Sequence, residues 1–112
     1  MKVEEHSDID WEKHPLLPAV AQDAGSGEVL MLAYVNKATL ELSLDTGYAH
    51  YFSRSRQSLW KKWESSGHLQ KIREIRLDCD NDALLYIVEQ TGPACHTGER
   101  SCFYKLIKQV SE

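Results

Sequence analysis

Two apolar segments separated by turn-forming residues dominate the first third of the chain. Residues 16–22 and 29–35 are mainly apolar, and residues 23–28 between them contain two glycines, an aspartate and a serine. These residue types accept the backbone angles that tight turns require. Residues 16–35 therefore predict a β-hairpin.

One helix and several further strands are predicted after this hairpin. Asn36 is a favourable helix N-cap, Ala38 and Leu42 share one face of a helix over residues 37–45, and Gly47 ends it. Residues 1–14 predict a turn or a short helix, and the remaining strand-like segments are 48–53, 71–78, 83–90 and 102–108. The pattern predicts an α+β fold, rich in antiparallel β-sheet with one or two short helices.

The size and charge of the chain limit the kinds of protein that it can be. A length of 112 residues suits a single domain over residues 1–112, and self-association would add core to so small a unit. The net charge of −4 argues against a generally basic nucleic-acid-binding surface. The first residues are acidic and no apolar run approaches the roughly 20 residues of a membrane span, so we expect a cytoplasmic protein without a membrane partner.

Three cysteines, Cys79, Cys95 and Cys102, are the first candidates for chemistry. Their odd number argues against a disulfide framework, and none forms a C-x₂-C pair. Three thiolates with an open fourth position would describe a catalytic zinc site, whereas His96 as a fourth ligand would close a structural one. Spacing alone equally permits three unrelated core cysteines.

Three aspartates, Asp78, Asp80 and Asp82, surround Cys79 in the sequence. If this segment is extended, the three carboxylates lie on one side of the strand and the thiol on the other. Carboxylate oxygens suit Mg²⁺. Taken alone, such a cluster is more often a solvated acidic turn between two strands.

A basic segment with tryptophans precedes the aspartates. Arg54, Arg56 and Lys61 lie near Trp60 and Trp63. Guanidinium groups match phosphate oxygens, and an indole can stack on a base. Taken alone, the segment is more often a charged exposed loop.

Together and in this order, these segments resemble the phosphoribosyl-AMP cyclohydrolase family. The matching elements are Ser53-Arg54-Ser55-Arg56, Leu59-Trp60, Glu64 with Ser66-Gly67-His68-Leu69-Gln70, Asp78-Cys79-Asp80-Asn81-Asp82, and Ala94-Cys95-His96-Thr97-Gly98 with Ser101-Cys102-Phe103. The likeness covers roughly residues 16–107, the expected core of the domain. One departure is Trp63, which stands where the family usually has glycine.

The resemblance implies an enzyme of histidine biosynthesis that hydrolyses the N1–C6 bond in the adenine ring of 1-(5-phosphoribosyl)-AMP. It implies zinc ligands at Cys79, Cys95 and Cys102, with one zinc per subunit shared across the interface of an intertwined homodimer. It further implies a magnesium site at Asp78, Asp80 and Asp82, a general base at His96, and phosphate contacts from Arg54, Arg56, Lys61 and His68. The alternative is a non-catalytic, zinc-stabilised module that binds a nucleotide or a protein.

Overall fold

The computed structural model describes residues 8–61 and 69–110, and its first two strands are the predicted hairpin. β1 (Leu17–Asp23) and β2 (Val29–Val35) pair antiparallel, with Leu17 opposite Val35. Asp23 opens the turn and Gly27 closes it at a φ of 79°. Glycine reaches this left-handed backbone region without steric cost. The turn residues therefore fix the register that the apolar pattern requires.

The predicted helix is also confirmed. α1 (Lys37–Thr46) begins after Asn36, whose Oδ1 accepts the Thr39 N–H at 2.9 Å while Thr39 Oγ1 accepts the Asn36 N–H at 2.9 Å. Gly47 ends the helix at a φ of 79°. The face that Ala38 shares with Leu42 is not the most buried one, because Thr39, Leu40 and Ser43 face the core while Ala38 is exposed. Ser43 Oγ accepts the His50 N–H at 2.8 Å, so a polar contact joins α1 to the next strand.

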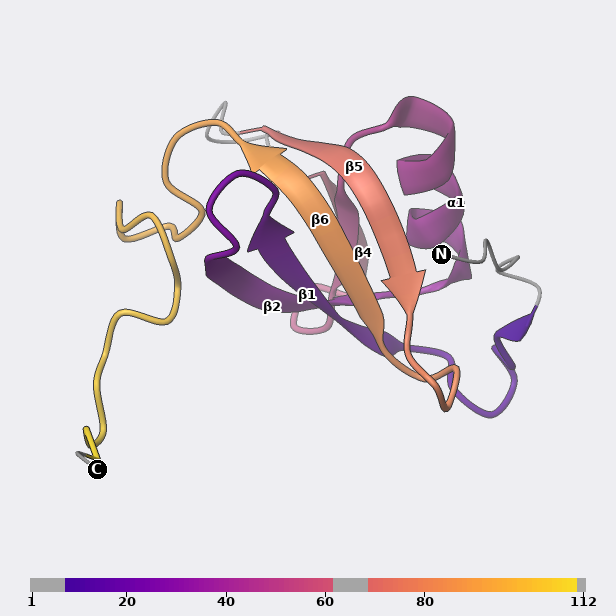
Figure 1. Ribbon diagram of the computed structural model, residues 1–112. Helices are drawn as coiled ribbons and strands as arrows, with labels where there is room; N and C mark the ends of the chain where they lie inside the picture. The colour runs from indigo at the N-terminus through magenta and orange to yellow at the C-terminus, as the bar shows by residue number, and fades with distance from the viewer. Residues whose placement is uncertain (1–7, 62–68, 111–112) are drawn as a thin grey trace.

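In the described part of the chain, six strands form one mixed sheet with α1 packed against β2 and β3 (Figure 1). The further strands are β3 (His50–Ser53), β4 (Ser58–Lys61), β5 (Gln70–Leu77) and β6 (Leu84–Gln90), and the order across the sheet is β4-β3-β2-β1-β6-β5. β1 and β6 run parallel, and the other neighbours are antiparallel. The α+β class is confirmed, whereas the antiparallel prediction is wrong for this one pair.

Two strand assignments differ from the sequence prediction. β4 was not predicted, because Ser58–Lys61 lies in a polar stretch; it pairs with β3 through a loop in which Gln57 has a φ of 51°. The predicted strand at 102–108 is wrong, because this segment extends away from the sheet (Figure 1). Its apolar side chains are exposed, with Ile107 fully so and Leu106 at 75%.

The core lies where β1 and β6 turn the same face inward. The buried side chains are Leu17, Ala19 and Ala21 on β1 and Leu84, Tyr86 and Val88 on β6. Ile9 joins this core from the N-terminal segment, where turns at residues 8–13 agree with the prediction for that region. In the parts of the chain that the structure describes, no helix is long and apolar enough to cross a membrane.

A buried polar network crosses this core. Tyr51 on β3 donates its hydroxyl to Gln70 Oε1 at 2.5 Å, and Gln70 Nε2 donates to Gln90 Oε1 at 2.9 Å. Tyr51 and Gln70 are both fully buried. Burial raises the pKa of Tyr51 well above its usual value, so the phenol stays protonated and available as a donor. The network therefore ties three strands together at one end of the sheet.

We expect Tyr51→Phe to lower the free energy of unfolding by about 1–3 kcal/mol, because it leaves the Gln70 carbonyl without its donor inside the core. Urea denaturation followed by circular dichroism measures the change. Tyr48→Phe is the matched control, since the Tyr48 hydroxyl has no hydrogen-bond partner within residues 8–61 and 69–110. Equal stability of the two variants would contradict the role of the network.

Candidate metal centre

The loop that follows β6 brings two of the three cysteines into one structural unit. The Ala94 N–H donates to the Arg100 carbonyl at 3.0 Å and the Cys95 N–H to the Glu99 carbonyl at 3.1 Å. Gly98, at a φ of 96°, closes the turn inside the loop with an N–H bond to the Cys95 carbonyl at 3.0 Å. Residues 94–102, which we call the thiol loop, are thus held by their own backbone. Cys95 is buried and Cys102 is exposed.

Cys95 has the environment of a metal-binding thiol. The Thr97 hydroxyl donates to Cys95 Sγ at 3.0 Å. Hydrogen bonds from the side chain and backbone of Thr97 lower the pKa of the Cys95 thiol, and the Cys102 side chain adds a smaller effect in the same direction. A lowered pKa favours the thiolate, which is the form that binds metal. His96, the next residue in the chain, is exposed.

Cys79 lies at the other end of β6. It precedes this seven-residue strand by five residues, and Cys95 follows the strand by five. Seven extended residues span about 20 Å, and Figure 1 shows the turn before β6 and the loop after it at opposite ends of the strand. Thiolates on one zinc lie within about 4 Å of each other. Cys79 therefore cannot share a zinc with Cys95 and Cys102 of the same chain.

The three aspartates form the turn between β5 and β6. Their carboxylate oxygens lie within 4.8 Å of one another, and this is the one group of at least three His, Cys, Asp or Glu side chains at that spacing within the described ranges. The segment is a turn and is not extended: Asp78 Oδ1 accepts the Asp82 N–H at 2.9 Å, and Asn81 has a φ of 62°. Of the two conformations that the sequence allowed, the structure shows the acidic turn between two strands, and in it the three carboxylates converge.

The pKa values of two carboxyls in the aspartate turn shift in opposite directions. Backbone hydrogen bonds, led by that of Asp82, lower the pKa of the Asp78 carboxyl. The hydrogen bond with Asp78, desolvation, and the charges of Asp78 and Asp80 raise the pKa of Asp82. The turn thus concentrates negative charge on an exposed surface, and a divalent cation would relieve that repulsion.

The basic segment lies at the far edge of the sheet. Arg54 and Arg56 are exposed in the β3–β4 loop, and the Arg54 guanidinium lies 3.9 Å from the centre of the Tyr34 ring. This cation–π contact fixes one end of Arg54 against β2. Lys61 ends β4, but the description of the structure does not extend to its side chain; His68, Trp63 and Glu64 lie outside the described residues.

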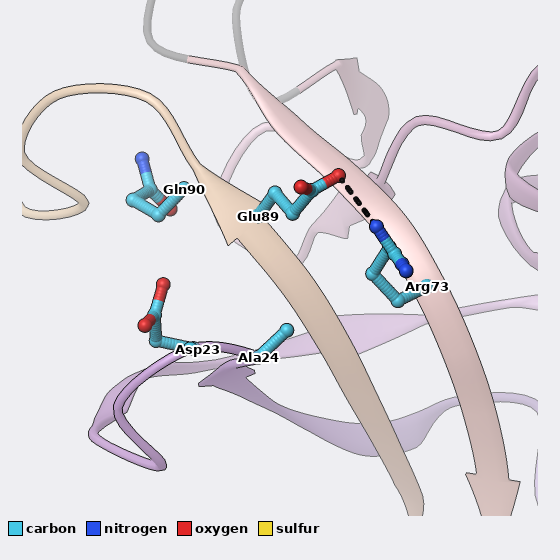
Figure 2. A pocket seen from close by; sticks show the side chains of 6 residues that line it. Asp23, Ala24, Arg73, Glu89 and Gln90 are labelled. Atoms are coloured by element: carbon cyan, nitrogen blue, oxygen red, sulfur yellow. Dashed lines mark ion pairs between the residues drawn. The ribbon is translucent and has the colours of Figure 1, made fainter.

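A cavity of about 400 Å³ lies at the end of β1, between the β1–β2 turn and the β5–β6 pair (Figure 2). Its described lining residues are Asp23, Ala24, Gly25, Arg73, Glu89 and Gln90. Arg73 and Glu89 form an exposed ion pair at 3.4 Å across its rim. No cysteine is among these lining residues, so the cavity is separate from the thiols.

Three residues that contact a candidate site residue or hold the thiol loop were given no role from the sequence. Thr97 lies two positions after Cys95, and a hydroxyl at that distance within a tight loop is a recognisable donor to the thiol. Tyr34 lies 20 positions before Arg54, and only the pairing of β2 with β3 brings them together. Arg100 contacts residues of the β1–β2 turn more than 70 positions away, which no local pattern indicates.

Comparison with known proteins gives matches that cover most of the chain. The sequence profile of phosphoribosyl-AMP cyclohydrolase matches residues 31–104. The histidine biosynthesis bifunctional protein HisIE of Wolinella succinogenes is 65% identical over 100 residues, which are 89% of this chain and 44% of that protein. The chain thus spans less than half the length of this bifunctional relative.

Two relatives that this chain covers over most of their length are both named phosphoribosyl-AMP cyclohydrolase. The phosphoribosyl-AMP cyclohydrolase of Haloquadratum walsbyi is 62% identical over 100 residues, covering 89% of this chain and 76% of the relative. That of Archaeoglobus fulgidus is 54% identical over 101 residues, covering 90% of this chain and 94% of the relative. The family profile spans the aspartate turn and the whole thiol loop.

We expect Thr97→Val to raise the pKa of the Cys95 thiol, because the variant removes the hydroxyl that stabilises the thiolate. Alkylation of Cys95 in metal-free protein should therefore reach its half-maximal rate at a higher pH. Peptide mass spectrometry can follow Cys95 separately from the other cysteines. Thr91→Val, an exposed position outside the loop, is the control, and an unchanged pH profile for Thr97→Val would refute the assignment.

Proposed function

The chain belongs to the phosphoribosyl-AMP cyclohydrolase family, and from that membership we propose that it hydrolyses the N1–C6 bond of 1-(5-phosphoribosyl)-AMP in histidine biosynthesis. Water adds at C6, the N1–C6 bond breaks, and the proton passes to the departing nitrogen. The observation that carries the proposal is 62% identity over 89% of the chain to a relative of that name. The comparison does not favour the alternative of a non-catalytic zinc module.

We propose that zinc is bound by Cys95 and Cys102 of one protomer and Cys79 of its partner, with one ion per subunit. The residues fit the ion: the donors are thiols, and Cys95 has a lowered pKa. The separation of Cys79 from the thiol loop along β6 supports a ligand set drawn from two chains. When bound, zinc supplies the Lewis acidity that makes water a nucleophile near neutral pH.

The C-terminal segment supports the homodimer that this shared site requires. Four apolar side chains between residues 103 and 110 are at least 62% exposed: Phe103, Leu106, Ile107 and Val110. The segment begins at Cys102 and extends away from the sheet (Figure 1). A second copy of the chain would cover this surface and bring its own Cys79 to the thiol loop.

The other residues serve binding and proton transfer in this proposal. His96 accepts and returns the proton of the attacking water, because its imidazole is exposed and directly follows Cys95 in the sequence. Asp78, Asp80 and Asp82 hold Mg²⁺, which would neutralise a substrate phosphate. Arg54 and Arg56, with Lys61 and His68, contact phosphate oxygens. A cytoplasmic location stays a prediction from the sequence.

We expect the Cys102→Ala variant to lose its bound zinc, because it lacks one of the three ligands on which the ion depends. Its turnover should fall at least 100-fold. Absorbance of the imidazole product measures turnover, and elemental analysis measures zinc per chain. Chelation of the native protein should abolish activity, and added zinc should restore it. Full activity in Cys102→Ala would show that the zinc assignment is wrong.

Mixing two inactive variants tests the shared site directly. Cys79→Ala and Cys102→Ala should each be inactive alone, because each breaks both sites of its own dimer. After subunit exchange about half of the dimers are mixed, and one of the two sites in each mixed dimer is intact, so about one quarter of native activity should return. A mixture without recovery, despite proven exchange, would contradict a site made from two chains.

A further inference from the structure

Arg100 joins the thiol loop to the turn of the first hairpin. Its Nη2 donates to Asp23 Oδ1 at 2.9 Å, and its Nε donates to Glu28 Oε1 at 3.2 Å. The two carboxylates belong to the ends of the β1–β2 turn, more than 70 residues earlier in the chain. One guanidinium thus bridges two acidic side chains, a geometry that its fixed fork of donors permits.

The acceptor Asp23 is also held in place by hydrogen bonds from its own turn, independently of Arg100. Asp23 Oδ2 accepts the Ser26 N–H at 2.8 Å and the Ser26 hydroxyl at 2.9 Å, so Oδ1 is left for Arg100. The Asp23 side chain is only 12% exposed. These hydrogen bonds, together with the Arg100 charge, lower the pKa of the Asp23 carboxyl and keep it ionised at neutral pH. By contrast, the pair of Arg73 and Glu89 is 58% and 50% exposed and involves one carboxylate.

The backbone of Arg100 also contributes a hydrogen bond to the thiol loop. Its carbonyl accepts the Ala94 N–H at 3.0 Å, which closes the loop around Cys95. The next two residues bind β2, because Ser101 Oγ donates to the Val29 carbonyl at 2.7 Å and the Cys102 N–H donates to the Leu30 carbonyl at 2.7 Å. Three successive residues therefore dock the loop on the hairpin.

We propose that Arg100 is a positioning residue, which holds the thiol loop on the β1–β2 hairpin so that Cys95 and Cys102 are already paired before a metal arrives. Its function at the metal rests on the zinc site proposed above, whereas its effect on the loop does not. A preformed pair of thiols loses less conformational entropy on binding than a mobile pair. Lysine cannot replace arginine here, because an ammonium lacks the planar fork that reaches both carboxylates.

Amide hydrogen exchange of the metal-free protein tests the positioning role without zinc. Arg100→Ala should speed the exchange of the Cys95, Gly98 and Cys102 amides roughly three- to tenfold, the range expected for losing two partly exposed ion pairs. Arg100→Lys should give most of that increase. Amides that pair β5 with β6 should not change, and the control Arg73→Ala should leave the thiol loop unaffected. Unchanged exchange in the loop of Arg100→Ala would overturn the proposal.

Glu28→Gln separates the ion pair from general effects of losing arginine. It should give part of the Arg100→Ala increase, and combining both changes should add nothing to Arg100→Ala alone, because both remove one interaction. Independent, additive effects of the two changes would show that the guanidinium does not act through this carboxylate.

Metal titration then tests the consequence for the site. Arg100→Ala should weaken zinc binding by a similar factor in competition with a chelator, and Co²⁺ bound to it should show weaker thiolate charge-transfer absorption than Co²⁺ bound to the native protein. Native affinity and spectrum in Arg100→Ala would overturn the role at the metal. If the native protein binds neither ion, the zinc site itself is wrong, and the exchange experiment still decides whether Arg100 positions the loop.

Discussion

The parallel pairing of β1 with β6 determines where every candidate metal ligand lies. Because the two strands run the same way, both end beside the β1–β2 turn, and the Ala24 N–H donates to the Val88 carbonyl at 2.7 Å there. The chain leaving β6 therefore enters the thiol loop next to Asp23 and Glu28, within reach of Arg100. The same pairing sends the start of β6, with Cys79 and the aspartate turn, to the opposite end of the sheet.

Local sequence signals were sufficient for elements whose contacts are close in sequence. The first hairpin, the Asn36 cap and the Gly47 stop depend on residues a few positions apart, and all three were predicted correctly. The parallel β1–β6 pair could not be predicted, because the inward-facing residues of a strand alternate in the same way whichever direction its neighbour runs. The strand predicted at 102–108 is wrong for another reason: its apolar residues predict burial, but within residues 8–61 and 69–110 no strand of the same chain pairs with this segment.

For the candidate site too, the sequence indicated some features, and others are visible only in the tertiary structure. The cysteines and aspartates were named from the sequence by their resemblance to a family, and the geometry adds how they are held. The aspartate carboxylates converge through a turn made by Asn81 and by backbone bonds to Asp78, which residue alternation did not indicate. Thr97 donates to a thiol only two positions away, whereas Arg100 donates to carboxylates more than 70 positions away. The Arg100 contacts depend on tertiary structure and leave no spacing pattern in the sequence.

The proposed zinc site would couple metal binding to assembly of two chains, and the division of its ligands would set the strength of that coupling. The thiol loop is already formed in a single chain, so binding the metal would require ordering one further thiol, the Cys79 of a second copy. Four exposed apolar side chains, starting one residue after Cys102, would become buried in the same event, each worth up to about 1.5–3 kcal/mol if fully removed from water. Burial of this segment and ligation by Cys102 involve adjacent residues, so a partner that covers one stabilises the other. The hydrophobic surface would then supply most of the affinity between chains, while the metal specifies the geometry in which they meet.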